Sequence, residues 1–372
     1  MKKPPISFDV IIDNLAQIAA ALSDGVAARV LYEIWKRLSG AFGTEAWSVC
    51  EKPWGVTVTF NGEDAVKCLQ AELMEAARRP VTSRTQRIVT SLNVSFVDPG
   101  KAVLCPELDA VQYRIEMCAA APAYEVLDAG KMRFAEQPVI GVGYGARPLY
   151  YECLARLVDQ NSAVFLPGDY MGVLERLGLR RAFGWHVLRE VVRQLVIRPD
   201  VVLGCNVSAL SAVNDIRWTS ALGELRRRPE IAERLVIEIT ETAALPRVVD
   251  AMAFVAAVQR TGARVALDDF GAGHSSADFA REAKVDIFKS DGSYLRNRLS
   301  GNGQHLLTHL VNLVSGFSPT VEVEGIERTG DLQTAIKPGA KFFPGYYFQA
   351  PKLLDPVPPS TEREKLHRQT IR

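Results

Sequence analysis

The sequence has almost no imbalance of charge, and this argues against one large class of function. Its 372 residues include 44 lysines and arginines against 43 aspartates and glutamates, so the formal net charge is +1. Proteins that coat DNA or RNA need a broad basic surface to neutralise phosphates, so we expect no nucleic-acid partner. The short basic cluster at residues 226–228 is typical of a solvated helix face.

Paired cysteines and long apolar runs are also missing. The six cysteines are scattered and none forms a Cys-x-x-Cys pair, which favours reduced thiols in a cytosolic core. No run approaches the ~20 apolar residues that a membrane helix needs. Asp9, Asp13 and Asn14 interrupt what would be the apolar region of a signal peptide. We therefore expect a soluble, cytoplasmic protein without a membrane span.

From about residue 130 onward, short apolar runs alternate with amphipathic helical stretches. This alternation is typical of parallel βα units, and eight strands in ~220 residues suit an α/β fold, a (β/α)8 barrel of the TIM type. A doubly wound open sheet is the alternative, but the glycine-rich stretch 141–145 lacks the following helix pattern that a phosphate-binding turn requires. The expected strands are residues 138–142, 149–154, 201–207, 235–239, 264–267, 285–289, 320–323 and 341–348.

The first ~125 residues follow a different pattern, which indicates a smaller α+β domain. The expected elements are a helical segment over 8–41, a hairpin over 47–60, a helix over 64–79, a strand over 87–96 and a helix over 106–119. Prolines and many charges follow residue 354 and are typical of a frayed tail or a linker. We therefore expect an α+β domain over residues 1–125, a barrel over 130–352 and a Pro-rich charged tail over 353–372.

Acidic residues gather at the ends of the expected barrel strands. Asp268 and Asp269 are adjacent and follow an apolar run, where two like charges are costly unless a cation lies between them. The C-terminal ends of barrel strands meet at one mouth, so we expect the residues there to converge. The other polar residues at such positions are Glu152, Asn206, Glu238, Glu241, Lys289, Asp291, Glu324 and Glu327.

The residue types at the expected mouth indicate metal chemistry. Carboxylate and amide oxygens are hard ligands that suit Mg²⁺ or Mn²⁺. Carboxylates around one point can hold two metals about 3.5–4 Å apart, an arrangement that hydrolyses phosphate esters. Asp268 is the candidate bridge between the metals, and Lys289 is the candidate cation for the attacking water. A network of buried ion pairs without catalysis is the structural alternative.

Six short motifs over roughly residues 130–352 resemble the EAL-domain cyclic di-GMP phosphodiesterases of bacteria. They read ECLAR, NVSA, EITE, LDDFGAGHSS, VDIFKSD and VEGIE, in the order and spacing of that family. The resemblance implies a barrel whose first strand runs antiparallel to the others. It also implies hydrolysis of cyclic di-GMP to pGpG at a two-metal Mg²⁺ or Mn²⁺ site, inhibition by Ca²⁺, and a homodimer.

The same resemblance implies roles for individual residues. Lys289, Glu152 and Glu324 form the implied catalytic group, in which Lys289 holds the attacking water. Glu241 resembles the glutamate that anchors the loop after the fifth strand. The implied metal ligands are Glu152, Asn206, Glu238, Asp268, Asp269 and Glu324, and the implied dinucleotide contacts are Gln137, Leu154, Arg156 and Asp291.

The sequence also departs from the family pattern. Ala272 replaces a threonine in the loop after Asp269, so Glu241 has no hydroxyl there to hold. Pro344 stands where the family usually has glutamine, and proline offers neither that amide nor a backbone N–H. We therefore expect reduced turnover. The alternatives are a catalytically weak or inactive cyclic di-GMP receptor and a ligand-free signalling scaffold.

The first domain resembles a degenerate GGDEF (diguanylate cyclase) domain in its order of elements. The hairpin that should carry the Gly-Gly-Asp/Glu-Glu-Phe motif reads EKPWGV over residues 51–56. This stretch has no acidic pair for a metal and a nucleotide. We therefore expect no cyclase activity and a scaffold or dimerisation role.

Overall fold

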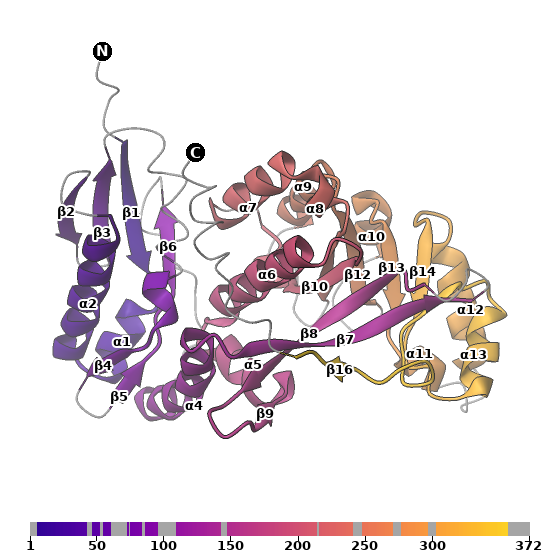
Figure 1. The fold of residues 1–372 in the computed structure, drawn as a ribbon, viewed down its shortest axis with the longest axis horizontal. Coiled ribbons are helices and arrows are strands. Elements are labelled where there is room, and N and C mark those ends of the chain that lie inside the picture. The colour runs from indigo at the N-terminus through magenta and orange to yellow at the C-terminus, as the bar shows by residue number, and fades with distance from the viewer. Residues whose placement is uncertain are drawn as a thin grey trace, which may run out of the picture.

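The computed structural model contains a small N-terminal sheet with its helices and a larger barrel, which lie on the left and right of Figure 1. Colour runs from indigo in the sheet to yellow at the far side of the barrel. The structure describes residues 6–42, 47–52, 55–60, 73, 75–83, 86–95, 109–142, 147–213, 216–240, 248–270, 277–296 and 303–355.

The N-terminal sheet begins with a strand that the sequence did not predict. Residues expected to start a helix form β1 (Ile6–Ile12), which is followed by α1 (Leu15–Ala21) and α2 (Asp24–Phe42). Apolar, β-branched runs of this length fit a strand or a helix, and pairing decides between them. β1 is hydrogen-bonded on both sides, to β3 (Gly55–Phe60) and to β6 (Leu92–Ser95), so the expectation of helix there is wrong.

The other N-terminal predictions had mixed outcomes. The hairpin is confirmed as β2 (Trp47–Lys52) paired with β3. The single strand expected over 87–96 is two strands, β5 (Gln86–Ile88) and β6, and β5 pairs with β4 (Val81–Ser83). The helix expected over 64–79 lies largely outside the described residues, although 75–78 are helical.

One long helix joins the two parts of the molecule. α4 (Ala110–Asp128) is longer than the helix expected over 106–119, and the side chain of Asp109 caps it by accepting from two backbone N–H groups at 2.9 Å. Its Glu116 pairs with Arg176 of α5 (Pro167–Arg176) at 2.6 Å, and the hydroxyl of Tyr124 donates to the Leu179 carbonyl at 3.3 Å. α4 therefore holds the barrel while it also packs against α1 and β5.

The barrel is closed and has eight strands, as expected. In order around the barrel they are β8, β10, β11, β12, β13, β14, β15 and β7, and a direct β7–β8 pairing closes the ring and excludes the open doubly wound sheet. β7 runs antiparallel to both its neighbours, which confirms the reversed first strand. The bounds are β7 Met132–Gly141, β8 Tyr150–Val158, β10 Leu203–Ser208, β11 Leu235–Thr240, β12 Arg264–Phe270, β13 Ile287–Ser290, β14 Thr320–Val323 and β15 Phe342–Phe343.

The last barrel strand is much shorter than the expected 341–348. β15 ends at Phe343 because Pro344 has no N–H to give to a neighbouring strand. Gly345 then takes a φ of +151°, and a Cβ there would lie 2.4 Å from the carbonyl oxygen of Ile326. The chain therefore turns away after two paired residues, and β16 (Lys352–Leu353) returns to pair with β7.

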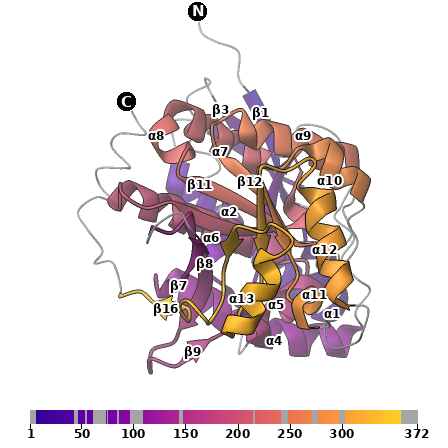
Figure 2. The same ribbon diagram turned by 90° about the vertical axis from the view of Figure 1, so that its right-hand side faces the viewer.

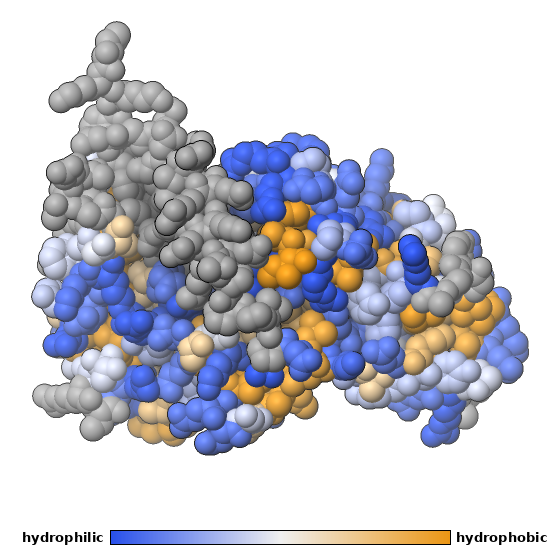
Figure 3. Space-filling model, in the orientation of Figure 1, coloured by the Kyte–Doolittle hydropathy of each residue, from blue (hydrophilic) through white to orange (hydrophobic). Residues whose placement is uncertain are grey.

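Helices cover the outside of the barrel, as Figure 2 shows for α9, α10, α12 and α13. The barrel helices after α5 are α6 Arg180–Ile197, α7 Ile216–Arg227, α8 Pro229–Ala232, α9 Val248–Gln259, α10 Ala277–Ala283, α11 Ser293–Arg296, α12 Gly303–Val314 and α13 Thr329–Ile336. No helix in the described ranges is long and apolar enough to cross a bilayer. The visible surface is largely hydrophilic, with separate apolar patches, one of them around β9 (Val164–Phe165) (Figure 3).

Candidate metal centre at the barrel mouth

Side chains from neighbouring strands fill the barrel interior in layers. Five buried residues, one from each of five strands, form a small internal cluster: Val139, Tyr150, Val236, Ala266 and Ile287. Side chains alternate along a strand, so the residue two positions further points the same way. On β8, β11, β12 and β13 these next residues are Glu152, Glu238, Asp268 and Lys289.

Lys289 is the centre of this upper layer. Its side chain is 1% exposed, and its ammonium group lies 2.7 Å from Glu238 Oε2, 3.0 Å from Asp268 Oδ1 and 3.1 Å from Glu324 Oε1. It also donates to Glu152 Oε1. An ammonium has three N–H donors, so four carboxylates more than saturate it. The structure thus brings together five residues that the sequence marked as candidates.

The electrostatics of the layer show an excess of acid. Burial alone would lower the pKa of Lys289, but Asp268, Glu152 and Glu238 outweigh it and the net pKa lies well above the usual value. Burial raises the pKa of Glu238 well above its usual value although Lys289 opposes the rise. The pKa values of Glu324 and Asp268 are raised for the same reason. One lysine does not balance the negative charge of four carboxylates, and a further cation would reduce the repulsion among them.

The geometry of the carboxylates fits a divalent cation. One oxygen each of Glu152, Asp268 and Glu324 lie within 4.8 Å of one another. Asn206 stands beside Glu238 in the pairing of β10 with β11, so its side chain lies on the same face of the sheet. Glu238 Oε1 has no hydrogen-bond partner within the described structure. Hard oxygen donors in this number suit Mg²⁺ or Mn²⁺.

Two further candidates lie at the edge of this layer. Asp269 directly follows Asp268 at a φ of +56°, and burial, followed by the charge of Asp268, raises its pKa to about 6. Asp291 follows β13 and accepts from the backbone N–H of Ser293 at 2.8 Å. In this structure the Asp291 side chain therefore caps the N-terminus of the short helix α11.

The candidate substrate contacts lie on β7 and β8. Gln137 pairs in register with Glu152, and its side chain donates to the carbonyl of Gln349 at 3.3 Å. Arg156 lies further along β8, partly buried, and donates to the carbonyl of Ala155 at 3.0 Å. Burial lowers the pKa of Arg156, with Tyr170 and Tyr346 acting in the opposite direction. Glu241 and Ala272 lie outside the described residues.

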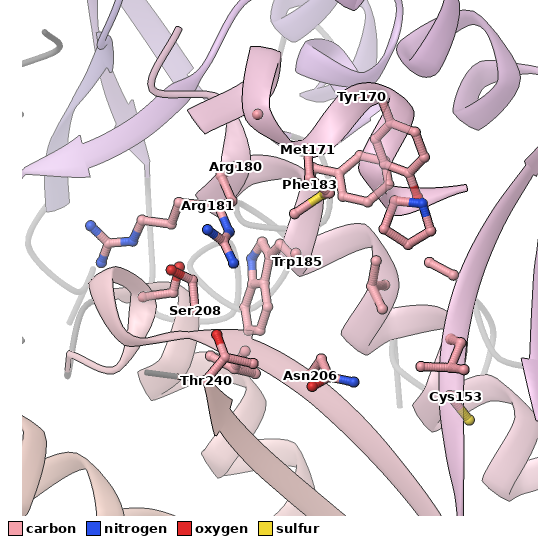
Figure 4. Close-up of a pocket in the computed structure, with 18 of the residues that line it drawn as sticks. Cys153, Tyr170, Met171, Arg180, Arg181, Phe183, Trp185, Asn206, Ser208 and Thr240 are labelled. Carbon is pink, nitrogen blue, oxygen red and sulfur yellow. The ribbon is translucent and has the colours of Figure 1, made fainter. Parts of the chain in front are cut away.

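A cavity of about 400 Å³, which the sequence did not predict, opens beside Asn206 and Leu154 (Figure 4). Tyr170 and Trp185 reach it from α5 and α6, and Ser208 from the end of β10. The Tyr170 hydroxyl, the Trp185 indole N–H and the Ser208 hydroxyl are buried and have no hydrogen-bond partner within the described structure. The helix residues of this wall could not be found from strand ends, because only the tertiary packing brings them there.

Two interior residues below the acid layer were also missed. Glu322 and Tyr150 are fully buried, and the Tyr150 hydroxyl lies 3.1 Å from Glu322 Oε2 and 3.2 Å from Glu238 Oε2. Burial raises the pKa of Glu322 to about 8. The signal was present in the sequence, because Glu322 precedes Glu324 by two residues and therefore shares its face of the strand.

Comparison with known proteins gives a consistent result. The EAL domain family matches residues 121–351, which is more than half of the chain. The cyclic di-GMP phosphodiesterase PdeF of Escherichia coli (strain K12) is 26% identical over 224 residues, which cover 59% of this chain and 30% of that protein. The chain thus spans less than a third of the length of that relative.

Solved structures share the fold. The FimX EAL domain from Pseudomonas aeruginosa bound to c-di-GMP gives a TM-score of 0.54 at 21% identity, covering 62% of this chain and 95% of that one. The Vibrio cholerae LapD S helix-GGDEF-EAL structure gives a TM-score of 0.57 at 14% identity, covering 92% of this chain and 89% of that one. At these identities the likeness is one of fold.

Proposed function

The chain belongs to the EAL domain family, and from its barrel mouth we propose that it is a metal-dependent phosphodiesterase that hydrolyses cyclic di-GMP to pGpG. The observation that carries this proposal is the convergence of Glu152, Glu238, Asp268 and Glu324 on Lys289. A buried set with so many acids and one cation is costly to keep unless it binds something positive. The names of relatives such as PdeF support the choice of substrate.

We assign the ligand positions as the motifs suggest. Glu152, Asn206, Glu238 and Asp268 would hold the first Mg²⁺ or Mn²⁺, and Asp268, Asp269 and Glu324 would hold the second. When bound, the two cations supply a deprotonated water and offset the charge of the phosphodiester. Ca²⁺ prefers more ligands at longer distances, so we expect it to bind without supporting hydrolysis.

The proposed role of Lys289 in holding the attacking water follows from the number of hydrogen bonds that it can donate. Its three N–H groups face four carboxylates in this structure, so any carboxylate that turns toward a cation frees an N–H for water. The oxygen of that water bonds to phosphorus, the P–O3′ bond breaks, and the 3′ oxygen leaves with a proton. The product is linear pGpG, in which one phosphate has become terminal.

We propose that the cavity beside Asn206 receives a guanine base and that Arg156 contacts a phosphate. The cavity offers the aromatic rings of Tyr170 and Trp185 and their free donors, which suit the carbonyl and ring nitrogens of a purine. Leu154 lines the same cavity and precedes Arg156 by two residues on β8. An arginine makes charge-assisted hydrogen bonds to a phosphate oxygen.

The deciding experiment is turnover of cyclic di-GMP by the purified chain with Mg²⁺ or Mn²⁺, with products separated by chromatography. We expect pGpG to form with either metal, and not with Ca²⁺ or a chelator. Binding to the same sample is measured in Ca²⁺. Absence of both product and binding would reject the proposal.

A cyclic di-GMP receptor is the second candidate, and Pro344 favours it. Pro344 is buried and lies two residues beyond Phe342, which pairs with Glu322. It therefore stands close to the acid layer. A glutamine there could donate to water or substrate from its side-chain amide, and proline cannot. Tight binding in Ca²⁺ without pGpG in Mg²⁺ would identify a receptor.

We propose that the N-terminal part is a degenerate GGDEF-like scaffold without cyclase activity. The fold likeness to the LapD GGDEF-EAL structure over 92% of the chain supports this assignment. A cytoplasmic homodimer remains our expectation. Light scattering of the purified chain measures its mass directly, and a monomer at micromolar concentration would contradict the dimer.

A further inference from the structure

A second polar layer lies directly beneath the acid cluster, in a part of the barrel where apolar side chains are expected. Glu322 pairs in register with Lys289 and points the same way as Glu324, one step deeper. Tyr150 stands two residues before Glu152 on β8. Both are 0% exposed, and the neighbours of Tyr150 in its internal cluster are Val139, Val236, Ala266 and Ile287.

Hydrogen bonds connect this deeper layer to one proposed metal ligand. The Tyr150 hydroxyl lies 3.1 Å from Glu322 Oε2 and 3.2 Å from Glu238 Oε2. A hydroxyl has one proton, which can serve only one of the two carboxylates. The hydroxyl lies between the two carboxylates, and in one of its two orientations it donates to Glu238 Oε2. Glu238 Oε2 then accepts from two sides, because Lys289 also donates to it at 2.7 Å.

The strand beside Glu238 leaves room for this orientation. A Cβ at Gly204 would lie 2.1 Å from Glu238 Oε1 and 2.8 Å from a ring carbon of Tyr150. Glu238 Oε1 therefore lies against β10, the strand that carries Asn206 two residues further on. This oxygen has no hydrogen-bond partner within the described structure, whereas Oε2 accepts from Lys289.

Stability alone does not account for the deeper layer. A buried tyrosine and glutamate cost desolvation free energy that apolar residues of similar volume would avoid. Glu322 Oε1 has no hydrogen-bond partner among the described residues, so the cost is not fully offset. What the two residues provide is a fixed direction for the Glu238 carboxylate.

We propose that Tyr150 and Glu322 are positioning residues for Glu238: they fix its carboxylate through Oε2 and so raise the affinity of the site for its divalent cation. The inference rests on the proposed function. Partners that orient a ligand typically contribute about 10–100-fold to metal affinity or activity. Neither residue needs to touch substrate or cation.

The test compares two tyrosines that are equally buried. Tyr150→Phe removes the hydroxyl below Glu238, and Tyr124→Phe removes the hydroxyl of a 0% exposed tyrosine that donates to Leu179 on the other side of the barrel wall. The readout is the equilibrium affinity of the full chain for Mn²⁺ without substrate, with the unfolding midpoint measured in a chelator. We expect Tyr150→Phe to weaken Mn²⁺ binding about tenfold or more and Tyr124→Phe to leave it unchanged.

Two variants of Glu322 test the same positioning role, and they remain informative if Tyr150→Phe does not fold. The amide of Glu322→Gln can donate to the Tyr150 oxygen and leave the hydroxyl proton for Glu238, so we expect it to keep Mn²⁺ affinity within about twofold. Glu322→Leu cannot donate, and we expect clearly weaker binding.

The outcomes separate the inference from the proposed function. If the unchanged chain binds no Mn²⁺, the proposed metal site fails. If it binds and Tyr150→Phe binds equally well, or if Gln and Leu at position 322 are equivalent, only the positioning role is overturned. A lower unfolding midpoint with unchanged affinity would likewise assign Tyr150 to stability alone.

Discussion

The two parts of this chain treat charge in opposite ways. In the N-terminal part, charged side chains form pairs at or near the surface, such as Arg78 with Glu75 at 2.6 Å and Arg87 with Glu125 at 2.8 Å. In the barrel, four carboxylates surround Lys289, which is 1% exposed. Surface pairs contribute little to stability, whereas a buried excess of acid is costly. The difference supports our proposal that the chemistry of the chain takes place in the barrel.

Buried polar atoms without a partner among the described residues occur in both parts, Gln17 Oε1 and Thr90 Oγ1 among them in the first, so the contrast lies in which atoms carry charge. In the N-terminal part, Asn14 is 1% exposed and its amide donates to the Val89 carbonyl at 2.9 Å and accepts from Ser91 N–H at 3.2 Å. It ties the start of α1 to the chain between β5 and β6. In the barrel, Glu238 and Glu322 each keep an oxygen without a partner among the described residues. A buried carboxylate oxygen without a partner needs an explanation, and for Glu238 the explanation that we propose is a cation.

Glu152→Gln tests the comparison most severely. It removes a charged oxygen from the cluster, and we expect turnover of cyclic di-GMP to fall by more than about a hundredfold, because a ligand matters more than its outer partners. The matched control is Glu75→Gln in the N-terminal surface pair, which should leave turnover unchanged. If the two changes lowered the initial rate equally, the claim that turnover depends on the barrel acids and not on the N-terminal surface pairs would be wrong.

Lys289→Met separates binding from chemistry. The ammonium competes with a divalent cation for the same carboxylates, so its removal should tighten Mn²⁺ binding while hydrolysis falls by about a hundredfold. Lys337→Met, at the exposed end of α13, should change neither quantity. Weaker Mn²⁺ binding in Lys289→Met would show that the lysine supports the ligands and does not compete with the metal.

Pro344→Gln sharpens the comparison within the barrel. If proline at this position limits the rate of hydrolysis, the side-chain amide and backbone N–H of glutamine should raise turnover severalfold at unchanged metal affinity. The measurement is the rate at saturating cyclic di-GMP. An unchanged rate would show that the site tolerates proline there.

The buried acids of the barrel should make the stability of the chain depend on pH. Burial raises the pKa of Asp269 to about 6 and that of Glu322 to about 8. An acid whose pKa is raised by folding stabilises the fold fully below its unfolded pKa, and this contribution is lost as pH rises through the folded value. In a chelator, the unfolding midpoint should therefore fall between about pH 5 and pH 8.

Lys289 does not cancel this trend, because its raised pKa affects stability only above its ordinary value of 10.5. Added Mg²⁺ should reduce the fall, since the cation binds the ionised carboxylates. The control is Glu322→Gln, which lacks one titrating group and should show a shallower slope. A midpoint that rises from about pH 5 to pH 8 in chelator would contradict the expectation.

The smallest expected effect lies in the N-terminal part. Arg87→Ala removes the exposed pair with Glu125, and we expect the free energy of unfolding to change by less than about 1 kcal/mol. Denaturant titration measures it. A larger loss would mean that surface pairs hold this part together and that the contrast with the barrel is overstated.

The sequence by itself determined the barrel and most of its acid layer. Eight apolar runs define the barrel strands, and six of them carry polar residues in or just after the run, so the strand pattern alone groups Glu152, Glu238, Asp268, Lys289 and Glu324. The reversed direction of β7 came from the family resemblance. These predictions succeeded because they rest on periodicity along a strand and on one geometric rule.

Only the tertiary structure decided the rest, because long-range pairing and packing do not leave a local signal. β1 is a strand because β3 and β6 flank it, although its own residues also fit a helix. The cavity wall joins Tyr170 and Trp185 from two helices to Ser208 from a strand. Tyr150 and Glu322 are 172 residues apart in the chain, and only closure of the barrel brings them together beside Glu238.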